Sequence, residues 1–153
     1  MKHLVIGAAV AATLALAGCG SKDAGAAGSP TSPTTAAALT HADFVTKANA
    51  ICQAGNAKVD AAAKNFADPQ NPTQAEIIDA TKNVLVPTFS DELDQLRALT
   101  PPPEDAAKVT ELESELDKAI SAANADPVAA LGGNAFAKAN TLAGQLGLTV
   151  CAS

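Results

Sequence analysis

The sequence predicts an all-α protein: an antiparallel four-helix bundle closed by one disulfide and preceded by a signal peptide and a disordered tether. Three observations favour this fold class. From residue 40 onward apolar residues recur every three or four positions, and no stretch alternates as a strand would. Prolines and capping residues divide this region into segments with short connections. Two of the three cysteines, Cys52 and Cys151, lie near its opposite ends.

Residues 1–18 have the three parts of an export signal. Lys2 places a positive charge beside the amino terminus, residues 4–17 form an uncharged apolar run, and small residues follow. This run is short for a helix that must cross about 30 Å of hydrocarbon. A removable signal peptide is therefore favoured over a permanent transmembrane helix.

The end of this segment, Leu16-Ala17-Gly18-Cys19, resembles the lipobox of bacterial lipoprotein signal peptides. The resemblance implies cleavage between Gly18 and Cys19 and a lipid, with acyl chains such as palmitate, on the Cys19 sulfur. Two or more acyl chains hold a protein stably on a bilayer. The predicted location is the outer face of the cytoplasmic membrane, in the cell envelope. The alternative is an ordinary secretory signal with a chance cysteine at position 19.

Residues 19–39 contain the cysteine and then a tether rich in Gly, Ala, Ser, Thr and Pro. Such a composition buries too little apolar surface to offset the entropy of ordering, so we expect disorder. The Ser and Thr residues around Pro30 and Pro33 have the composition of O-glycosylated stalks. A bare spacer is the alternative.

The helical-bundle domain is assigned to residues 40–153. Its first helix begins at Thr40, with Asp43 in the first turn, and ends near Ala67, before Asp68-Pro69. One apolar stripe follows this helix: Phe44, Ala48, Ile51, Cys52, Gly55, Val59, Ala62, Ala63 and Phe66.

The middle of the domain predicts two more helices. Residues 73–76 form a capping box that opens a helix reaching about Leu99, and Pro87 should kink or split it. The third helix should start near Pro103, with Glu104 in its first turn, and continue to about residue 123.

The last segment begins with Asp126-Pro127, an N-cap followed by proline at the first helical position. This start should give only a short helical turn, which the two glycines at 132–133 should end. A final helix should then cover residues 134–146. Gly147 suits a left-handed cap, with Leu148 folding back on the helix.

Cys52 and Cys151 are expected to form a disulfide, because thiols oxidise and pair in an exported domain and Cys19 is assigned to lipid. The alternative is a reactive or metal-binding cysteine. Metal binding lacks partners, since His41 is the one histidine that follows the signal peptide.

Composition and motifs exclude several function classes. The net charge is −6, and the chain has no Trp, Tyr or basic stripe, so nucleic-acid binding is not expected. Glu111, Glu113 and Glu115 do not converge, because i and i+2 point apart on a helix. We find no nucleophile with a base and no ligand cluster, so the sequence predicts no catalytic residue, no cofactor, no metal site and no enzyme.

The domain resembles a group of small, alanine-rich, two-cysteine exported proteins and lipoproteins of high-GC Gram-positive bacteria. The pieces that carry the resemblance are FVTKANAICQAGNAKV, LRALTPPP and GLTVCAS, and the resemblance covers most of residues 40–153. It implies a helical bundle pinned by a disulfide, without an activity, cofactor or ligand that can be assigned to residues here.

The predicted function is a membrane-anchored, non-catalytic interaction module that contacts another envelope protein or the cell wall. The alternative is a carrier of a small apolar molecule or lipid, because the alanine-rich faces and the kink at Pro87 could leave a cavity. A passive stalk or surface antigen is a third possibility.

Overall fold

The computed structural model describes residues 37–152, except for the side chains at 131 and 132. Their regular structure is helical, without strands, as expected. The predicted signal peptide, Cys19 and residues 20–36 of the tether lie outside the described residues. The elements are α1 (His41–Ala63), α2 (Gln74–Ala80), the π-helix η1 (Thr81–Leu85), α3 (Val86–Arg97), α4 (Ala106–Ala125), α5 (Pro127–Gly132) and α6 (Ala137–Gln145).

Helix α1 begins as predicted but ends earlier. The Thr40 side chain caps it by accepting a hydrogen bond from the Asp43 N–H. The helix ends at Ala63 rather than near Ala67, because the following residues turn toward α2. There the Ala67 N–H donates to Oε1 of Glu76, at 2.7 Å. The same glutamate completes the predicted capping box with Thr73, so one side chain joins this turn to the start of α2.

The predicted second helix is divided into α2, η1 and α3. Pro87 has no N–H to donate to the carbonyl of Asn83, and its ring would crowd that carbonyl in a regular α-helix. The chain widens by one residue instead, and the Val86 N–H donates to the Thr81 carbonyl, five residues back. The predicted interruption at Pro87 therefore takes the form of a π-helical turn just before the proline.

The last three helices follow the predicted order with shifted ends. Helix α4 begins at Ala106 rather than near Pro103, because the Pro102 carbonyl accepts from both Asp105 and Ala106 in a preceding turn. Asp126 caps α5 through the Ala129 N–H, as expected from Asp126-Pro127. Helix α6 spans Ala137–Gln145, shorter at both ends than the predicted 134–146.

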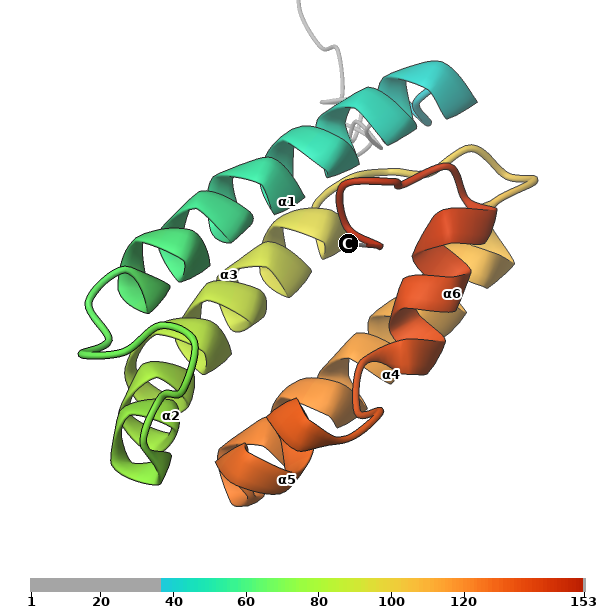
Figure 1. Cartoon of the computed structure of the whole chain (residues 1–153). Coiled ribbons are helices and arrows are strands. Elements are labelled where there is room, and N and C mark those ends of the chain that lie inside the picture. The colour runs from blue at the N-terminus through green and yellow to red at the C-terminus, as the bar shows by residue number, and fades with distance from the viewer. Residues whose placement is uncertain (1–36, 153) are drawn as a thin grey trace, which may run out of the picture. The chain divides into compact units, whose positions relative to one another are not determined.

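The C-terminal residues close the core. Gly147 has φ +79°, the predicted left-handed cap, and Leu148 behind it is fully buried. Figure 1 shows α1 beside α3, α4 beside α6, and the segment after α6 running back between them. The buried core cluster consists of Phe44, Ala48, Leu96, Val109, Leu112, Ala139, Leu142, Ala143, Leu146 and Leu148.

The domain starts slightly before Thr40. Leu39, assigned to the tether by its neighbours' composition, packs against the core, and its N–H donates to the Thr100 carbonyl at 2.9 Å. The described residues belong to one compact unit. Because this unit has its own core and disulfide, we expect it to fold without the segment that precedes it.

Candidate functional site

A pocket of about 230 Å³ lies among α1, η1, α3, α4 and α6, beside the disulfide. Its volume exceeds the roughly 150 Å³ of an apolar cavity that holds benzene. Most of its wall is apolar, which suits a hydrophobic ligand. The lining residues are Cys52, Asn56, Leu85, Phe89, Glu92, Leu96, Leu112, Leu116, Phe136, Ala139, Asn140, Ala143 and Cys151.

Glu92, on α3, is the charged side chain among the described residues that line this pocket. Its Oε1 atom is buried and has no hydrogen-bond partner. Burial raises the pKa of Glu92 from 4.5 to about 7, while the positive charge of Lys58 on α1 partly opposes this rise. A buried carboxyl oxygen without a hydrogen-bond partner is costly.

Gly55, on α1, makes the space that the Glu92 carboxyl occupies. A Cβ atom at position 55 would overlap Oε1 of Glu92 and would also lie 3.1 Å from the Thr88 methyl group. Gly55 is buried within a helix, where glycine is about 1 kcal/mol less favourable than alanine. The close approach of the carboxyl gives this glycine a structural role.

Two aromatic rings flank the pocket from different elements. Phe89 of α3 and Phe136, the residue before α6, meet edge to face, with ring centroids 5.1 Å apart. Edge-to-face pairs at this separation are favourable beyond their area of burial. The pair therefore joins the α3 wall to the α6 wall.

The predicted disulfide between Cys52 and Cys151 is confirmed, and both cysteines line the pocket. Two asparagines of α1 fasten the same C-terminal segment. The Asn49 Oδ1 accepts from the Val150 N–H at 3.0 Å, and the Asn56 amide donates to the Val150 carbonyl at 3.2 Å. One side of the pocket is thus fixed by a covalent bond and two hydrogen bonds.

A second pocket, of about 320 Å³, lies between the C-terminal part of α1 and the α2–η1 segment. Its wall is almost wholly apolar. Thr81 is a polar member of the wall; it is fully buried, and its Oγ1 has no hydrogen-bond partner. Leu85 lines both pockets. The full set is Val59, Ala62, Ala63, Phe66, Pro72, Ile77, Ala80, Thr81, Val84 and Leu85.

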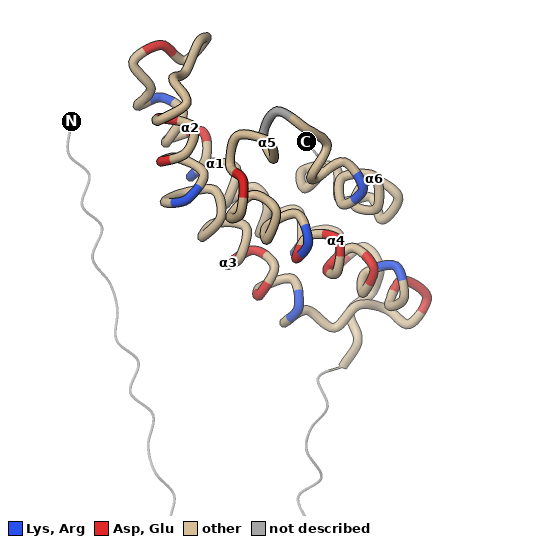
Figure 2. The backbone as a smooth tube through the Cα atoms, turned by 90° about the horizontal axis from the view of Figure 1, so that it is seen from below, with Lys and Arg blue, Asp and Glu red and all other residues tan. Residues whose placement is uncertain are grey.

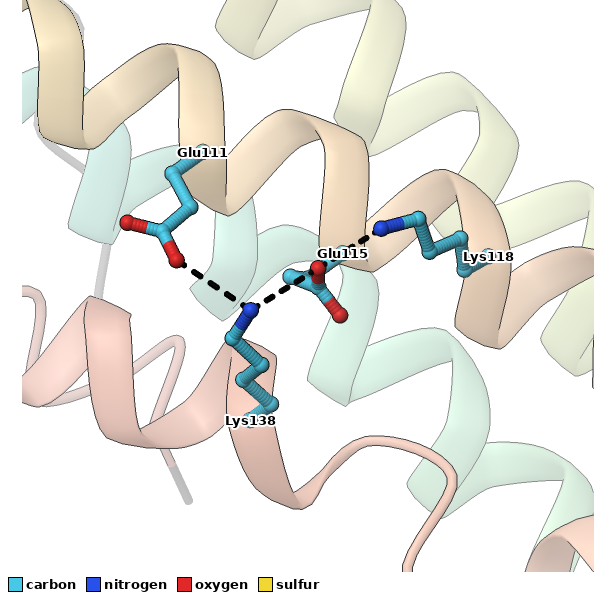
Figure 3. Close-up of polar contacts among 4 residues, drawn as sticks. All are labelled: Glu111, Glu115, Lys118 and Lys138. Atoms are coloured by element: carbon cyan, nitrogen blue, oxygen red, sulfur yellow. Dashed lines mark hydrogen bonds and ion pairs between the residues drawn. The ribbon is translucent and has the colours of Figure 1, made fainter.

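The expectation that Glu111, Glu113 and Glu115 do not converge is wrong for two of them. Glu111 and Glu115 converge on Lys138 of α6, whose Nζ lies 3.2 Å and 3.1 Å from their Oε1 atoms (Figure 3). Lys118 also reaches Glu115, at 2.8 Å. Positions i and i+2 point apart, but Glu111 and Glu115 are one helical turn apart, so a lysine from another helix can meet both.

His41 lies beside a carboxylate. Its Nδ1 lies 2.6 Å from Oδ2 of Asp105, the residue before α4. This pair joins the starts of α1 and α4, and its histidine is exposed. Elsewhere the basic residues are spread singly among acidic ones (Figure 2). Within residues 37–152 no cluster of His, Cys, Asp or Glu has the geometry to hold a metal ion.

Sequence reasoning missed Glu92 and the role of Gly55. A signal was present, because Glu92 lies three residues after Phe89 and four before Leu96, on the apolar face of its helix. Gly55 was placed in the apolar stripe of α1, but what it faces depends on how α1 and α3 pack together.

Comparisons with known proteins add no relative. No protein-family model, curated protein or solved structure matches the chain. Among the described helices, none combines the length and the hydrophobicity that crossing a membrane requires.

Proposed function

We propose that this protein is a lipoprotein of the cell envelope whose helical domain binds and carries a small, mainly apolar molecule. The observation that supports the proposal best is the pocket that contains the unpartnered carboxyl of Glu92. Its apolar walls would hold the body of the ligand by burial, and Glu92 would orient a donor group.

The sequence favoured an interaction module over a carrier, and the pocket reverses that order. A module that only contacts another envelope protein has no need for an interior pocket. Nor does such contact require a buried carboxyl, which lowers stability unless something pairs with it. Contact with an envelope protein or the cell wall remains compatible with a carrier that must deliver its ligand.

The proposal includes a lipid anchor on Cys19, after cleavage at Gly18, and an antiparallel arrangement of the long helices. The lipobox-like end of the signal peptide supports the anchor, and the short connections between helices support the topology. It includes no catalytic step. Glu92 has no second acid or base beside it among the described residues that line the pocket.

The test is binding of an apolar fluorescent probe, N-phenyl-1-naphthylamine, to residues 38–153 exported and purified without detergent. Native mass spectrometry of the same material would show whether a molecule from the host is already bound. We expect saturable probe binding to the wild type. Asn140→Phe, which fills the pocket from α6, should weaken binding more than tenfold.

The matched control is Asn124→Phe, at an exposed position of α4 outside the pocket. It should bind the probe as the wild type does. Absence of both a bound molecule and probe binding in the folded wild type would contradict the carrier function. Equal effects of the two substitutions would place the probe elsewhere on the protein.

A further inference from the structure

The two pockets follow one another along the same helices. On α1, the walls include Cys52 and Asn56 in the first pocket and Val59, Ala62 and Ala63 in the second. The opposite wall contains Glu92 and Phe89 in the first, then Leu85, then Val84 and Thr81 in the second. Leu85 lines both, so its side chain is the boundary between them.

The distance along this path can be estimated from each wall. Glu92 and Thr81 are separated by eleven residues, and so are Cys52 and Ala63. At about 1.5 Å per residue, each wall is roughly 16 Å long. With carbon–carbon bonds of about 1.5 Å, a zigzag chain of roughly twelve carbons has this length.

The chemistry of the wall differs between its two parts. Glu92 lines the first pocket with a carboxyl group, whose Oε1 is buried against Gly55 without a hydrogen-bond partner. The second pocket is larger and presents almost no polar surface, and the acceptor of Thr81 is buried in its wall. A ligand that satisfies both parts has a donor group at one end and a long apolar chain at the other.

The boundary lies in a segment with irregular backbone. Leu85 is the last residue of η1, and π-helical turns inside α-helices occur frequently at functional sites. Its side chain is only partly buried, so rotation about its bonds is not blocked by a close-packed core. A movement of this one side chain would therefore connect the two pockets.

We propose that the ligand is a single-chain amphiphile, with an amine head hydrogen-bonded to Glu92 and an alkyl tail that passes Leu85 into the second pocket. This inference rests on the proposed carrier function and specifies its ligand. A carboxylate selects a cationic donor over an anionic head of the same length. The net charge of −6 favours the same choice.

The experiment uses residues 38–153 and n-alkylamines of six to sixteen carbons, each below its micelle concentration, competing with N-phenyl-1-naphthylamine. Each methylene that enters an apolar site should raise affinity about fourfold, equivalent to about 0.8 kcal/mol. We expect this rise to continue to about twelve carbons and then stop. Decylamine should bind more tightly than decanoate, and Glu92→Gln should reduce that preference.

Leu85→Trp should close the boundary, so that affinity no longer rises with chain length beyond six carbons. Leu99→Trp, at a partly buried position outside both pockets, is the matched control. In this variant the affinity for alkylamines should depend on chain length as it does in the wild type. If Leu85→Trp does not fold, Ala80→Leu narrows the second pocket from α2 and should have the same effect on long chains.

The outcomes separate this inference from the carrier function. If the probe and hexylamine bind but longer chains gain nothing in the wild type, the carrier function stands and the two-pocket path is wrong. If Leu85→Trp weakens all chain lengths equally, the path is again wrong. If neither the probe nor any amine binds, the carrier function itself fails.

Discussion

The two ends of the domain bury their side chains very differently. At the packed end, defined by the core around Phe44, Leu146 and Leu148, these three side chains have at most 1% of their surface exposed. At the open end, defined by α2, η1 and the C-terminal part of α1, α2 has no buried residue, and a pocket of about 320 Å³ separates the helices. The largest fully buried apolar side chains therefore lie at the packed end, whereas a pocket remains at the open end.

This difference teaches how a small helical domain can hold a pocket and still fold. Regions with few buried apolar contacts open with lower free energy than the core. The open end can therefore admit a ligand by local movement, while the packed end keeps the fold intact. The disulfide and the Val150 hydrogen bonds hold the C-terminal segment to α1, so that segment does not take part in the opening.

The largest expected effect comes from removing the disulfide. Cys52 and Cys151 are 99 residues apart in sequence, and a loop of that length constrains the unfolded chain by about 4–5 kcal/mol in the chain-entropy model. Replacing both cysteines by alanine should lower the free energy of unfolding by about this amount, measured by guanidinium titration. A loss below about 1 kcal/mol would mean that packing alone holds the C-terminal segment.

A pair of matched substitutions tests the comparison directly. Leu146→Ala, at the packed end, removes a side chain that is 1% exposed and should cost about 3–4 kcal/mol, because a closed cavity remains. Leu85→Ala, at the open end, should cost only about 1 kcal/mol, because this side chain already borders two pockets. Urea unfolding of both variants gives the two values, and equal losses would remove the distinction between the ends.

The packed end was largely predictable from the sequence. The Thr40 cap, the left-handed Gly147 and the disulfide all follow from local chemistry or from cysteine parity. These features depend on a few neighbouring residues or on one covalent bond. Features of this kind can be predicted from a single sequence.

The open end was not predictable in the same way. A 3.6-residue period describes residues 73–99 well, but it does not reveal that the chain widens over η1 to accommodate Pro87. The meeting of Gly55 with Glu92 depends on the register between α1 and α3, which the apolar pattern leaves open. The turn after α1 contains a hydrogen bond from the Ala67 N–H to Glu76, across nine positions, which a helical period does not reveal.

Glu92 should have a smaller effect on the free energy of unfolding, and this effect should depend on pH. Its pKa in the folded protein is raised to about 7, so between pH 4.5 and 7 the folded state binds more protons than the unfolded chain. The stabilisation from its protonated form is complete below about pH 4.5 and is lost as pH rises through 7. After allowance for partial solvent contact, this loss is about 1–2 kcal/mol.

Glu92→Gln should remove that dependence. The variant should match the wild type at pH 4.5 and exceed its unfolding free energy by about 1–2 kcal/mol at pH 8, measured by urea unfolding across this range. Glu104→Gln, at an exposed position before α4, is the control and should follow the wild-type profile. Parallel profiles for wild type and Glu92→Gln would contradict the burial of this carboxyl.

The smallest expected effect concerns the charges between α4 and α6. Hydrogen bonds from Lys118 and then Lys138 hold the pKa of Glu115 below its ordinary value. Lys138→Met keeps an apolar stem and removes the ion pairs to Glu111 and Glu115. We expect the pKa of Glu115, followed by NMR, to move up toward its ordinary value.

The same substitution should lower the melting temperature only slightly at low salt, and not at all in 1 M salt, where the screening length falls to about 3 Å. Lys47→Met, an exposed lysine of α1, is the matched control and should leave the Glu115 titration unchanged. A large loss of stability that persists in 1 M salt would make ion pairs a principal support of the α4–α6 contact. The contrast between the packed and open ends would then rest on charge as well as on burial.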